Sequence, residues 1–248
     1  MKVLVTGAAR GIGYETARCF LAEGASVALN DLSPEAVDTA VASLGGRNVH
    51  AAAGSVAQVA DCERIVAQAV RALGGLDVLV NNAGVYVEAP AAQTDETLWD
   101  EIVDTNLKGT FFMSRAAAPH LRERGGAIVN VSSEAGVVGS PNVSAYAASK
   151  AGVIGLTRAL AMELVPTVRV NCICPSPTQT KIFDRTAETL ADPAAYRAAL
   201  AGYAPMQRMA RPEEIARAIL FLASRDASFV TGTALMVDGG VTAGSTTL

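Results

Sequence analysis

The 248-residue sequence has little of what metal centres and disulfide frameworks require. It contains two histidines, His50 and His120, which are far apart in the sequence and have no ligand-like neighbours. Its four cysteines include no C-x-x-C pair, and Cys172 and Cys174 alternate along an apolar segment, as buried free thiols do. We therefore expect a cytoplasmic protein with reduced cysteines and no bound metal.

Long apolar runs and clusters of basic residues are also missing. No stretch of about 18 apolar residues occurs, so we expect no membrane-spanning helix. The formal net charge is −4, and no run of lysine and arginine exceeds two residues, which argues against nucleic-acid binding. Hydrophobic residues make up 50% of the chain and charged residues 18%, a balance that favours a packed core over long disordered segments.

Short apolar segments alternate with helix-length amphipathic segments along the chain. The apolar segments are rich in Val, Leu, Ile and Ala on both faces, as in a parallel sheet that helices cover. We expect strands at 2–6, 26–31, 48–53, 76–84, 127–133, 168–174 and 234–240. The alternation predicts an α/β protein with a doubly wound parallel sheet, the Rossmann fold, in three layers α/β/α and as one domain over residues 1–248.

One segment, residues 176–211, interrupts this alternation. It has no strand pattern, its prolines are spaced out, and it carries two short helical stretches with Phe183, Tyr196, Tyr203 and Met206. An insertion at the carboxyl end of a strand that is rich in adaptable apolar residues is typical of a substrate lid. An ordinary helical excursion is the alternative.

A glycine-rich turn, TGAARGIG at residues 6–13, follows the first apolar segment. Its spacing is G-x-x-x-G-x-G. Glycine lets the backbone turn tightly and approach a pyrophosphate, while the N-terminus of the next helix supplies N–H groups and a positive dipole. Asp31 ends the second predicted strand, where a carboxylate binds the adenosine ribose in dinucleotide-binding folds. A surface aspartate that opens the turn before Ser33 and Pro34 is the alternative.

Polar side chains also mark the ends of the fourth and fifth predicted strands. NNAG, residues 81–84, ends the fourth, and Ser132 and Ser133 end the fifth, where a hydroxyl would point into the same crevice. Asn106 lies in a helix-forming segment, 95–124. The alternatives are a buried structural asparagine and serines that merely cap the strand.

The segment SAYAASKAG, residues 144–152, places Tyr146 and Lys150 four residues apart, on one face of a predicted helix. Taken alone, such a pair is usually a surface tyrosine beside a solvated lysine. The small residues between the two would let this helix approach a ligand closely.

The order of these motifs resembles the short-chain dehydrogenase/reductase family over almost the full length of the chain. The matching pieces are TGAARGIG, NNAG, the Asn106 segment, Ser133, YAASK, the segment 175–180 and VDGG at 237–240. The resemblance implies that Tyr146 is the general acid/base, and that Lys150 binds the nicotinamide ribose and lowers the pKa of Tyr146. It also implies that Ser133 polarises the substrate oxygen, and that Asn106 holds the water of a proton relay behind Lys150.

The resemblance further implies cofactor contacts from the turns that follow the strands. These contacts are Gly7, Arg10, Gly11, Ile12, Gly13, Asp31, Leu32, Ser55, Val56, Asn82, Ala83, Gly84, Tyr146, Lys150, Pro175, Ser176, Thr178 and Thr180. Substrate contacts are expected from Ser133 and Tyr146, from Glu134 beside them and from Phe183 in the predicted lid. Lys181, Ile182 and Arg185 are further lid candidates, and for the two charged residues the alternative is a solvated surface side chain.

Two positions depart from the family pattern. Ser176 stands where a glycine usually follows the proline after the sixth strand, so a positive φ there would strain the loop over the nicotinamide. Ser55 stands where an acidic residue often binds adenine, which leaves backbone groups of Val56 as the adenine contacts.

Two residues disagree about which dinucleotide is used. Arg10 matches a position where family members that use NADPH often carry a base for the 2′-phosphate. Asp31 would repel that phosphate and would hydrogen bond to an unphosphorylated ribose, and the next residue, Leu32, offers no base. We therefore predict NAD as the cofactor, with NADP as the less favoured alternative.

The sequence thus predicts an NAD(H)-dependent oxidoreductase that interconverts a secondary alcohol and its ketone by direct hydride transfer. An NADPH-dependent carbonyl or 3-oxoacyl reductase is the alternative, and a non-catalytic dinucleotide-sensing protein is a more remote one. The predicted partner is a small molecule, and neither nucleic acid nor a membrane is expected. A homotetramer is expected, because the helix from Ala145 to Glu163 has apolar residues on more than one side.

Overall fold

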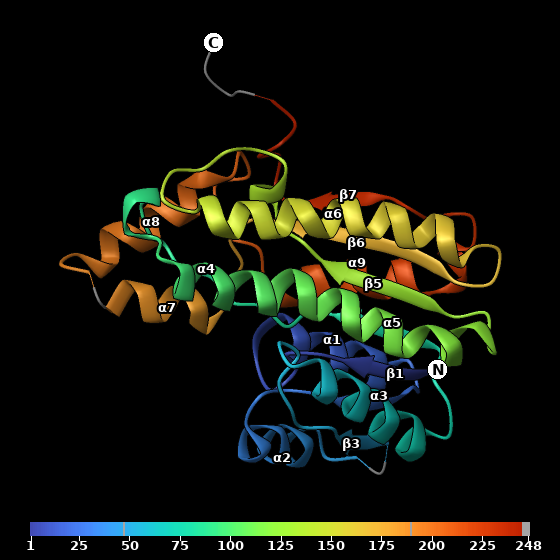
Figure 1. Ribbon diagram of the computed structural model, residues 1–248. Helices are drawn as coiled ribbons and strands as arrows, with labels where there is room; N and C mark the ends of the chain where they lie inside the picture. Colours follow the sequence, from blue (N-terminus) through green and yellow to red (C-terminus); the bar gives the residue numbers. More distant parts are fainter. Residues whose placement is uncertain (47, 189, 245–248) are drawn as a thin grey trace.

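The computed structural model describes residues 1–46, 48–188 and 190–244. The strands are β1 (Lys2–Val5), β2 (Ser26–Leu29), β3 (Val49–Ala51), β4 (Val78–Asn81), β5 (Ala127–Val131), β6 (Arg169–Pro175) and β7 (Ala234–Val237). They form one seven-stranded parallel sheet in the order β3-β2-β1-β4-β5-β6-β7 (Figure 1). The chain winds outward from β1 in both directions, so the predicted Rossmann sheet is confirmed.

Helices cover both faces of this sheet. They are α1 (Gly11–Ala22), α2 (Pro34–Leu44), α3 (Val59–Leu73), α4 (Glu96–Val103), α5 (Gly109–Arg122), α6 (Ser144–Leu164), α7 (Lys181–Glu188), α8 (Pro193–Tyr203) and α9 (Pro212–Ala223). Val3 and Val5 of β1 pack with Phe20 of α1 and Ile215 of α9 on one face. Leu4, between them, packs on the other face with α3, α5 and α6. Successive strand side chains point to opposite faces, so each short strand contributes to both cores.

The predicted helix over 95–124 is not continuous. It divides into α4, a π-helical turn (Asp104–Lys108) and α5. Asn106 lies in the π-helical turn, and its carbonyl accepts a hydrogen bond from Thr110 Oγ1 at 2.7 Å. Such turns occur mostly inside α-helices and are frequent at functional sites. The helical periodicity of the sequence carries no signal for this change.

The segment 176–211 contains two helices, α7 and α8, as the sequence predicts. They lie beside the start of α4, at the end of the molecule opposite the N-terminus (Figure 1). A single parallel bridge between Thr178 and Ala210 joins the two ends of the segment. Asp192 caps α8 by accepting hydrogen bonds from the N–H groups of Ala194 and Ala195. Among the residues that the structure describes, no helix has the length and apolar character that crossing a membrane requires.

Candidate active site

A cleft of about 1090 Å³ runs along the carboxyl ends of the strands, from the glycine-rich turn after β1 to the predicted lid segment, residues 176–211. The carboxyl ends of parallel strands meet at one edge of a sheet, which brings together residues from distant parts of the chain. The cleft wall includes every residue that the sequence analysis assigned to catalysis, cofactor or substrate except two. The exceptions are Gly13 and Asn106, which lie behind the wall.

The glycine-rich turn is fixed against the turn that follows β4. Thr6 Oγ1 accepts hydrogen bonds from the N–H groups of Asn82 and Ala83, both at 3.0 Å. Gly7 has a φ of +61°, and a Cβ there would lie 2.8 Å from Ala83 Cα. A Cβ on Gly13 would lie 2.3 Å from the Gly7 carbonyl oxygen. Gly13 therefore permits the first turn of α1 to pack on the loop rather than lining the cleft itself.

Asp31 lies beside this turn, at the end of β2. Its carboxylate accepts hydrogen bonds from Ala9 N–H at 3.1 Å and from Leu32 N–H at 2.8 Å. A carboxylate has about four lone-pair sites, so it keeps capacity for two further donors. Arg10 is exposed, and the Leu32 side chain is 70% exposed on the rim of the cleft. The carboxylate is therefore held by backbone groups, while Arg10 reaches into solvent.

The Asn106 side chain is fully engaged by the protein. Its Nδ2 donates to the Val85 carbonyl at 3.0 Å and to Ser149 Oγ at 3.1 Å, and its Oδ1 accepts from Val85 N–H at 2.8 Å. Both amide hydrogens are thus used. This arrangement ties the loop after β4 to α6, and it leaves one Oδ1 lone pair as the side chain's capacity for a water.

Lys150 and Ser132 connect α6 to the end of β5. Lys150 is almost completely buried, and its Nζ donates a hydrogen bond to the Val131 carbonyl at 2.9 Å. Burial lowers the pKa of Lys150 to about 8. Ser132 Oγ donates to the Lys150 carbonyl at 2.8 Å, so this serine positions the helix. Of the two serines, Ser133 is the one whose hydroxyl neighbours Tyr146.

Tyr146 lies on the cleft wall among these groups. Desolvation raises the pKa of Tyr146, hydrogen bonding by Ser133 opposes that rise, and the negative charge of Glu134 adds to it. Lys150 Nζ lies 5.7 Å from the centroid of the Tyr146 ring. The lysine is thus a cation that lies near the phenol ring.

Ser133 and Glu134 form a hydrogen-bonded pair on the same wall. Ser133 Oγ donates to Glu134 Oε2 at 2.8 Å and accepts from Ala135 N–H at 3.2 Å. Glu134 is 8% exposed, and desolvation raises the pKa of its carboxyl group. The sequence order predicted the proximity of these two residues but not the direction of the hydrogen bond.

The arrangement matches that of known proteins. A family model described as enoyl-(acyl carrier protein) reductase matches residues 7–242. The chain is 39% identical over 242 residues to a 3-oxoacyl-(acyl-carrier-protein) reductase FabG of Thermotoga maritima, covering 96% of each chain. It is also 39% identical over 242 residues to a meso-2,3-butanediol dehydrogenase of Serratia marcescens, covering 97% of this chain and 94% of the relative.

A solved structure from Brucella melitensis is described as a short-chain dehydrogenase/reductase, glucose/ribitol dehydrogenase. It superposes with a TM-score of 0.90 at 34% identity, covering 96% of this chain and 95% of that one. The protein belongs to the short-chain dehydrogenase/reductase family. The resemblance that the sequence motifs indicated is thereby confirmed.

The first departure from the family pattern causes no strain in this short-chain dehydrogenase/reductase. Among the described non-glycine residues, positive φ values occur at Asn142 and Gln207 and not at Ser176. Ser176 is buried, and its carbonyl accepts a hydrogen bond from Thr178 Oγ1 at 2.9 Å. The loop after β6 therefore accommodates serine in an ordinary backbone conformation, without the strain that a positive φ at this position would cause.

At the second departure, where Ser55 stands in place of an acidic residue, a carboxylate from α3 lies close by. Ser55 N–H donates a hydrogen bond to Asp61 Oδ2 at 2.9 Å, and Asp61 forms an ion pair with Arg64 at 2.7 Å. A carboxylate from α3 thus lies beside Ser55, although the sequence offers none at the end of β3. Its oxygens are engaged by Ser55 and Arg64, so Ser55 and Val56 remain the groups that line the cleft here.

Two residues that the sequence analysis did not assign, Tyr86 and Glu88, join the cleft wall to Tyr196 of the predicted lid segment. Tyr86, which follows β4, and Tyr196 of α8 both donate hydrogen bonds to Glu88 Oε1, at 2.7 and 3.0 Å. The Tyr86 ring packs edge-on against Tyr146 with ring centroids 4.9 Å apart, and lies 5.6 Å from the Phe183 ring. Tyr86 and Glu88 lie shortly after NNAG, which is a signal that they lie near the cleft. Tyr196 belongs to the segment 176–211 that the sequence predicts as a lid, but its hydrogen bond to Glu88 has no signal in the sequence.

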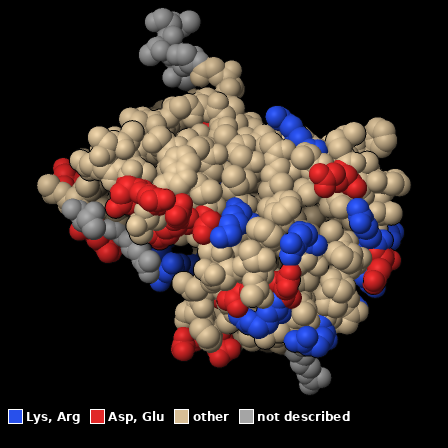
Figure 2. All heavy atoms as spheres, viewed as in Figure 1, with Lys and Arg blue, Asp and Glu red and all other residues tan. Residues whose placement is uncertain are grey.

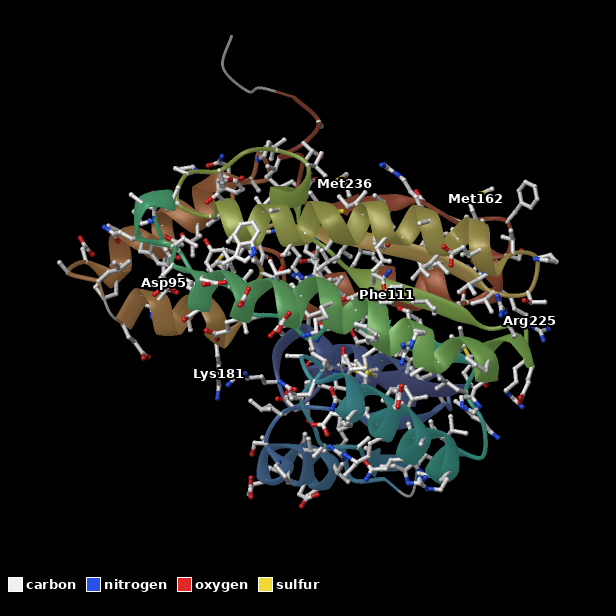
Figure 3. All side chains as sticks on the ribbon, in the orientation of Figure 1. Asp95, Phe111, Met162, Lys181, Arg225 and Met236 are labelled. Carbon is white, nitrogen blue, oxygen red and sulfur yellow. The ribbon has the colours of Figure 1, made fainter. Side chains whose placement is uncertain are left out.

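Acidic residues gather at the lid end of the cleft. Glu88, Asp100 and Glu101 line its mouth, and Figure 2 shows acidic side chains over the region of α4. Lys181 is exposed at the start of α7 (Figure 3). The side chains of the other two lid candidates, Ile182 and Arg185, lie outside the described residues. Lys181 lines the cleft together with Glu88, Asp100 and Glu101, so the described mouth carries more negative than positive charge and disfavours an anionic ligand.

Proposed function

We propose that this protein is a single-domain, NAD(H)-dependent oxidoreductase that interconverts a secondary alcohol and its ketone, with residues 176–211 as the substrate lid. The observation that carries the proposal is the placement of Ser133, Tyr146 and Lys150 on one wall of a cleft whose other end is the glycine-rich turn and Asp31. An acid/base group and a dinucleotide-sized cradle thus share one cavity.

The cleft residues fit a nicotinamide dinucleotide. Gly7 lets the turn pack closely against Ala83, and this turn lines the cleft together with Gly11 at the N-terminus of α1, where a pyrophosphate would bind. Asp31 and Leu32 would hold the adenosine ribose, and Lys150 the nicotinamide ribose. When bound, the dinucleotide accepts or returns a hydride at its nicotinamide ring. The protein's part is to orient the reactants and to move the proton.

Tyr146 is the residue that we assign to proton transfer. In the oxidation direction its phenolate takes the hydroxyl proton of the alcohol while the carbinol hydrogen leaves as hydride, so the C–O bond becomes a carbonyl. Ser133 donates a hydrogen bond to the reacting oxygen. Lys150 favours the phenolate, because its ammonium lies beside the ring. Asn106 acts behind this set by fixing the loop after β4 to α6.

Asp31 supports NAD(H) over NADP(H). Its carboxylate is fixed by Ala9 and Leu32, so it cannot turn away easily from a 2′-phosphate. At a separation of about 4 Å and an effective dielectric near 20, two unit charges interact by roughly 4 kcal/mol before salt screening. The exposed Arg10 offsets only part of this repulsion. We therefore expect a preference for NAD(H) of at least roughly tenfold in kcat/KM, which requires about 1.4 kcal/mol.

Formation of reduced nicotinamide, followed by its absorbance, tests the proposal. Wild-type protein is assayed with NAD⁺ and with NADP⁺ on butan-2-ol, butane-2,3-diol, cyclohexanol and an aldohexose. Turnover with NAD⁺ on at least one secondary alcohol supports the proposal. If the protein binds NADH but neither oxidises any of the alcohols nor reduces any ketone, it is a dinucleotide-sensing protein instead.

A second candidate is an NADPH-dependent carbonyl or 3-oxoacyl reductase. The FabG relative favours it, and so does the exposed Arg10. The acidic mouth disfavours it, because the carboxylates of Asp100 and Glu101 repel anionic carriers and thioesters. Reduction of acetoacetyl-coenzyme A with NADPH, compared with butanedione and NADH, separates the two candidates.

We also infer a homotetramer in the reducing cytoplasm. The four cysteines are free. Exposed apolar side chains lie on two parts of the molecule: Phe111 on α5 and Met162 on α6 (Figure 3), and Phe221 and Phe229 on and after α9. Two distinct self-contacts are what a tetramer with dihedral symmetry requires. Light scattering after size exclusion is expected to give four times the mass of the chain, and a monomer mass would contradict this.

A further inference from the structure

Glu134 is a buried carboxylate at the reacting end of the cleft that the proposed mechanism does not use. It begins a short 3-10 turn (Glu134–Gly136), directly after Ser133. Desolvation raises the pKa of its carboxyl group, and the charged residue that acts on it is Asp238, which adds to that rise. Within the described part of the chain it forms no ion pair with a lysine or arginine. Its side-chain donor is the Ser133 hydroxyl, at 2.8 Å.

This hydrogen bond conflicts with the role of Ser133. A serine hydroxyl carries one proton, and Glu134, at 2.8 Å, competes for it with Tyr146, where hydrogen bonding from Ser133 opposes the rise in pKa that desolvation causes. Ser133 therefore cannot donate to the reacting oxygen while it holds the carboxylate. If Ser133 rotates away, the buried Glu134 carboxylate loses its hydroxyl donor and keeps the backbone N–H groups of Glu134 and Ala135, which is costly for a buried charge. A substrate that brings a second donor removes this conflict.

We propose that Glu134 selects substrates with a hydroxyl on the carbon next to the reacting carbinol, namely vicinal diols and their α-hydroxyketones. The inference rests on the proposed alcohol–ketone oxidoreductase function. The second hydroxyl donates its proton to Glu134, and Ser133 then donates its own proton to the reacting oxygen. The two oxygens of a gauche vicinal diol are about one hydrogen-bond length apart, similar to the 2.8 Å between Ser133 Oγ and Glu134 Oε2.

The charges around the cleft favour a hydroxyl over other donors. Lys150, a buried ammonium, lies on the same wall and would repel a substrate ammonium. The acidic mouth, with Glu88, Asp100 and Glu101, disfavours carboxylate or phosphate substituents. A neutral polyhydroxy compound meets neither repulsion.

The test compares butane-2,3-diol with butan-2-ol, which differs by the one hydroxyl. With NAD⁺ saturating, we expect wild-type kcat/KM to be roughly 10- to 100-fold higher for a stereoisomer of the diol, the range for one hydrogen bond to a charged group. In Glu134→Leu the value for the diol should fall and the value for butan-2-ol should rise, because Ser133 is released. Opposite changes on the two substrates cannot come from partial unfolding.

Two more variants keep the test decisive. Glu134→Gln preserves the size of the side chain and replaces Glu134→Leu if that variant does not fold. It should lower the diol preference part of the way. NADH binding reports folding in each variant. Glu123→Gln removes the same charge from an exposed position at the end of α5, away from the cleft, and should leave the preference unchanged. Equal wild-type efficiency on both substrates, or an unaltered preference in both Glu134 variants, would overturn the inference while leaving the oxidoreductase function intact. Absence of turnover on every alcohol and ketone would overturn both.

Discussion

The two ends of the cleft are built differently. At the glycine-rich end, the contacts run from short side chains to backbone groups, as between Thr6 and the N–H groups of Asn82 and Ala83. At the lid end, side chains from distant segments meet each other, as between Tyr196 of α8 and Glu88 after β4. Contacts to the backbone hold the glycine-rich end in one geometry. Contacts between side chains at the lid end are altered by replacing a few residues, so substrate choice can vary while the dinucleotide site stays the same.

The largest loss of turnover should come from replacing Tyr146, which lies between the two ends of the cleft. Tyr146→Phe removes one hydroxyl and keeps the ring that packs against Tyr86. We expect turnover to fall by roughly 10²–10⁴-fold, as for other general acid/base residues, with NADH affinity unchanged. Steady-state kinetics and NADH fluorescence measure the two quantities. Tyr14→Phe, which removes a hydroxyl that contacts Ser43, is the matched control. Retention of most activity in Tyr146→Phe would show that another group transfers the proton.

A smaller effect is expected at Lys150, and it should depend on pH. Burial lowers the pKa of Lys150 to about 8, so the free protein loses this charge as the pH rises through that value. If the ammonium donates to the bound ribose, the complex keeps a proton that the free protein has lost, and NADH binding weakens above about pH 8. Lys150→Met should weaken binding by about tenfold at pH 7 and abolish this pH dependence. Lys2→Ala, at the opposite edge of the sheet, is the control; the same pH dependence in Lys150→Met would exclude the lysine as its source.

The glycine-rich end should respond to a change of charge alone. Asp31→Ser with Leu32→Arg removes the carboxylate and adds a base at the exposed rim. We expect the ratio of kcat/KM for NAD⁺ to that for NADP⁺ to fall by at least roughly tenfold, because the repulsion of the 2′-phosphate is removed. The same alcohol is used with both cofactors, so changes at the lid end cancel. A wild-type protein that already prefers NADP⁺ would show that Arg10 controls this end.

The lid end should give the smallest effect. Tyr196→Phe removes the hydroxyl that bonds to Glu88 at 3.0 Å. A neutral or singly charged surface hydrogen bond contributes about 1 kcal/mol, so we expect KM for the alcohol to rise severalfold with little change in the affinity for NADH. Tyr203→Phe, whose hydroxyl has only a 3.5 Å contact with Ser140, should have a smaller effect. Loss of NADH binding in Tyr196→Phe would mean that the two ends are not independent.

The same contrast explains what the sequence could predict. The glycine-rich turn, NNAG, Ser133 and the pair Tyr146 and Lys150 each follow a strand or share a helical face, so their meeting at one edge of the sheet follows from the topology. The strand pattern likewise gave the sheet, because apolar runs bounded by turns are local signals. These features depend on short-range order in the chain.

Other features depend on contacts that no local pattern carries. The π-helical turn at Asn106 depends on hydrogen bonds to Val85 and Ser149, which come from other elements. The pairing of Ser55 with Asp61 depends on how α3 packs beside the end of β3. The sequence places Glu134 beside Ser133, and only the folded wall shows that the Ser133 hydroxyl donates a hydrogen bond to the Glu134 carboxylate.

Isotope transfer tests the central claim most directly. A secondary alcohol carrying deuterium at the carbinol carbon is oxidised by the wild-type protein with NAD⁺, and the reduced cofactor is isolated and examined by NMR and mass spectrometry. Direct hydride transfer predicts one deuterium at C4 of the nicotinamide ring, on a single face, and none released to water. Recovery of the label in solvent, or equal labelling of both faces, would contradict the account.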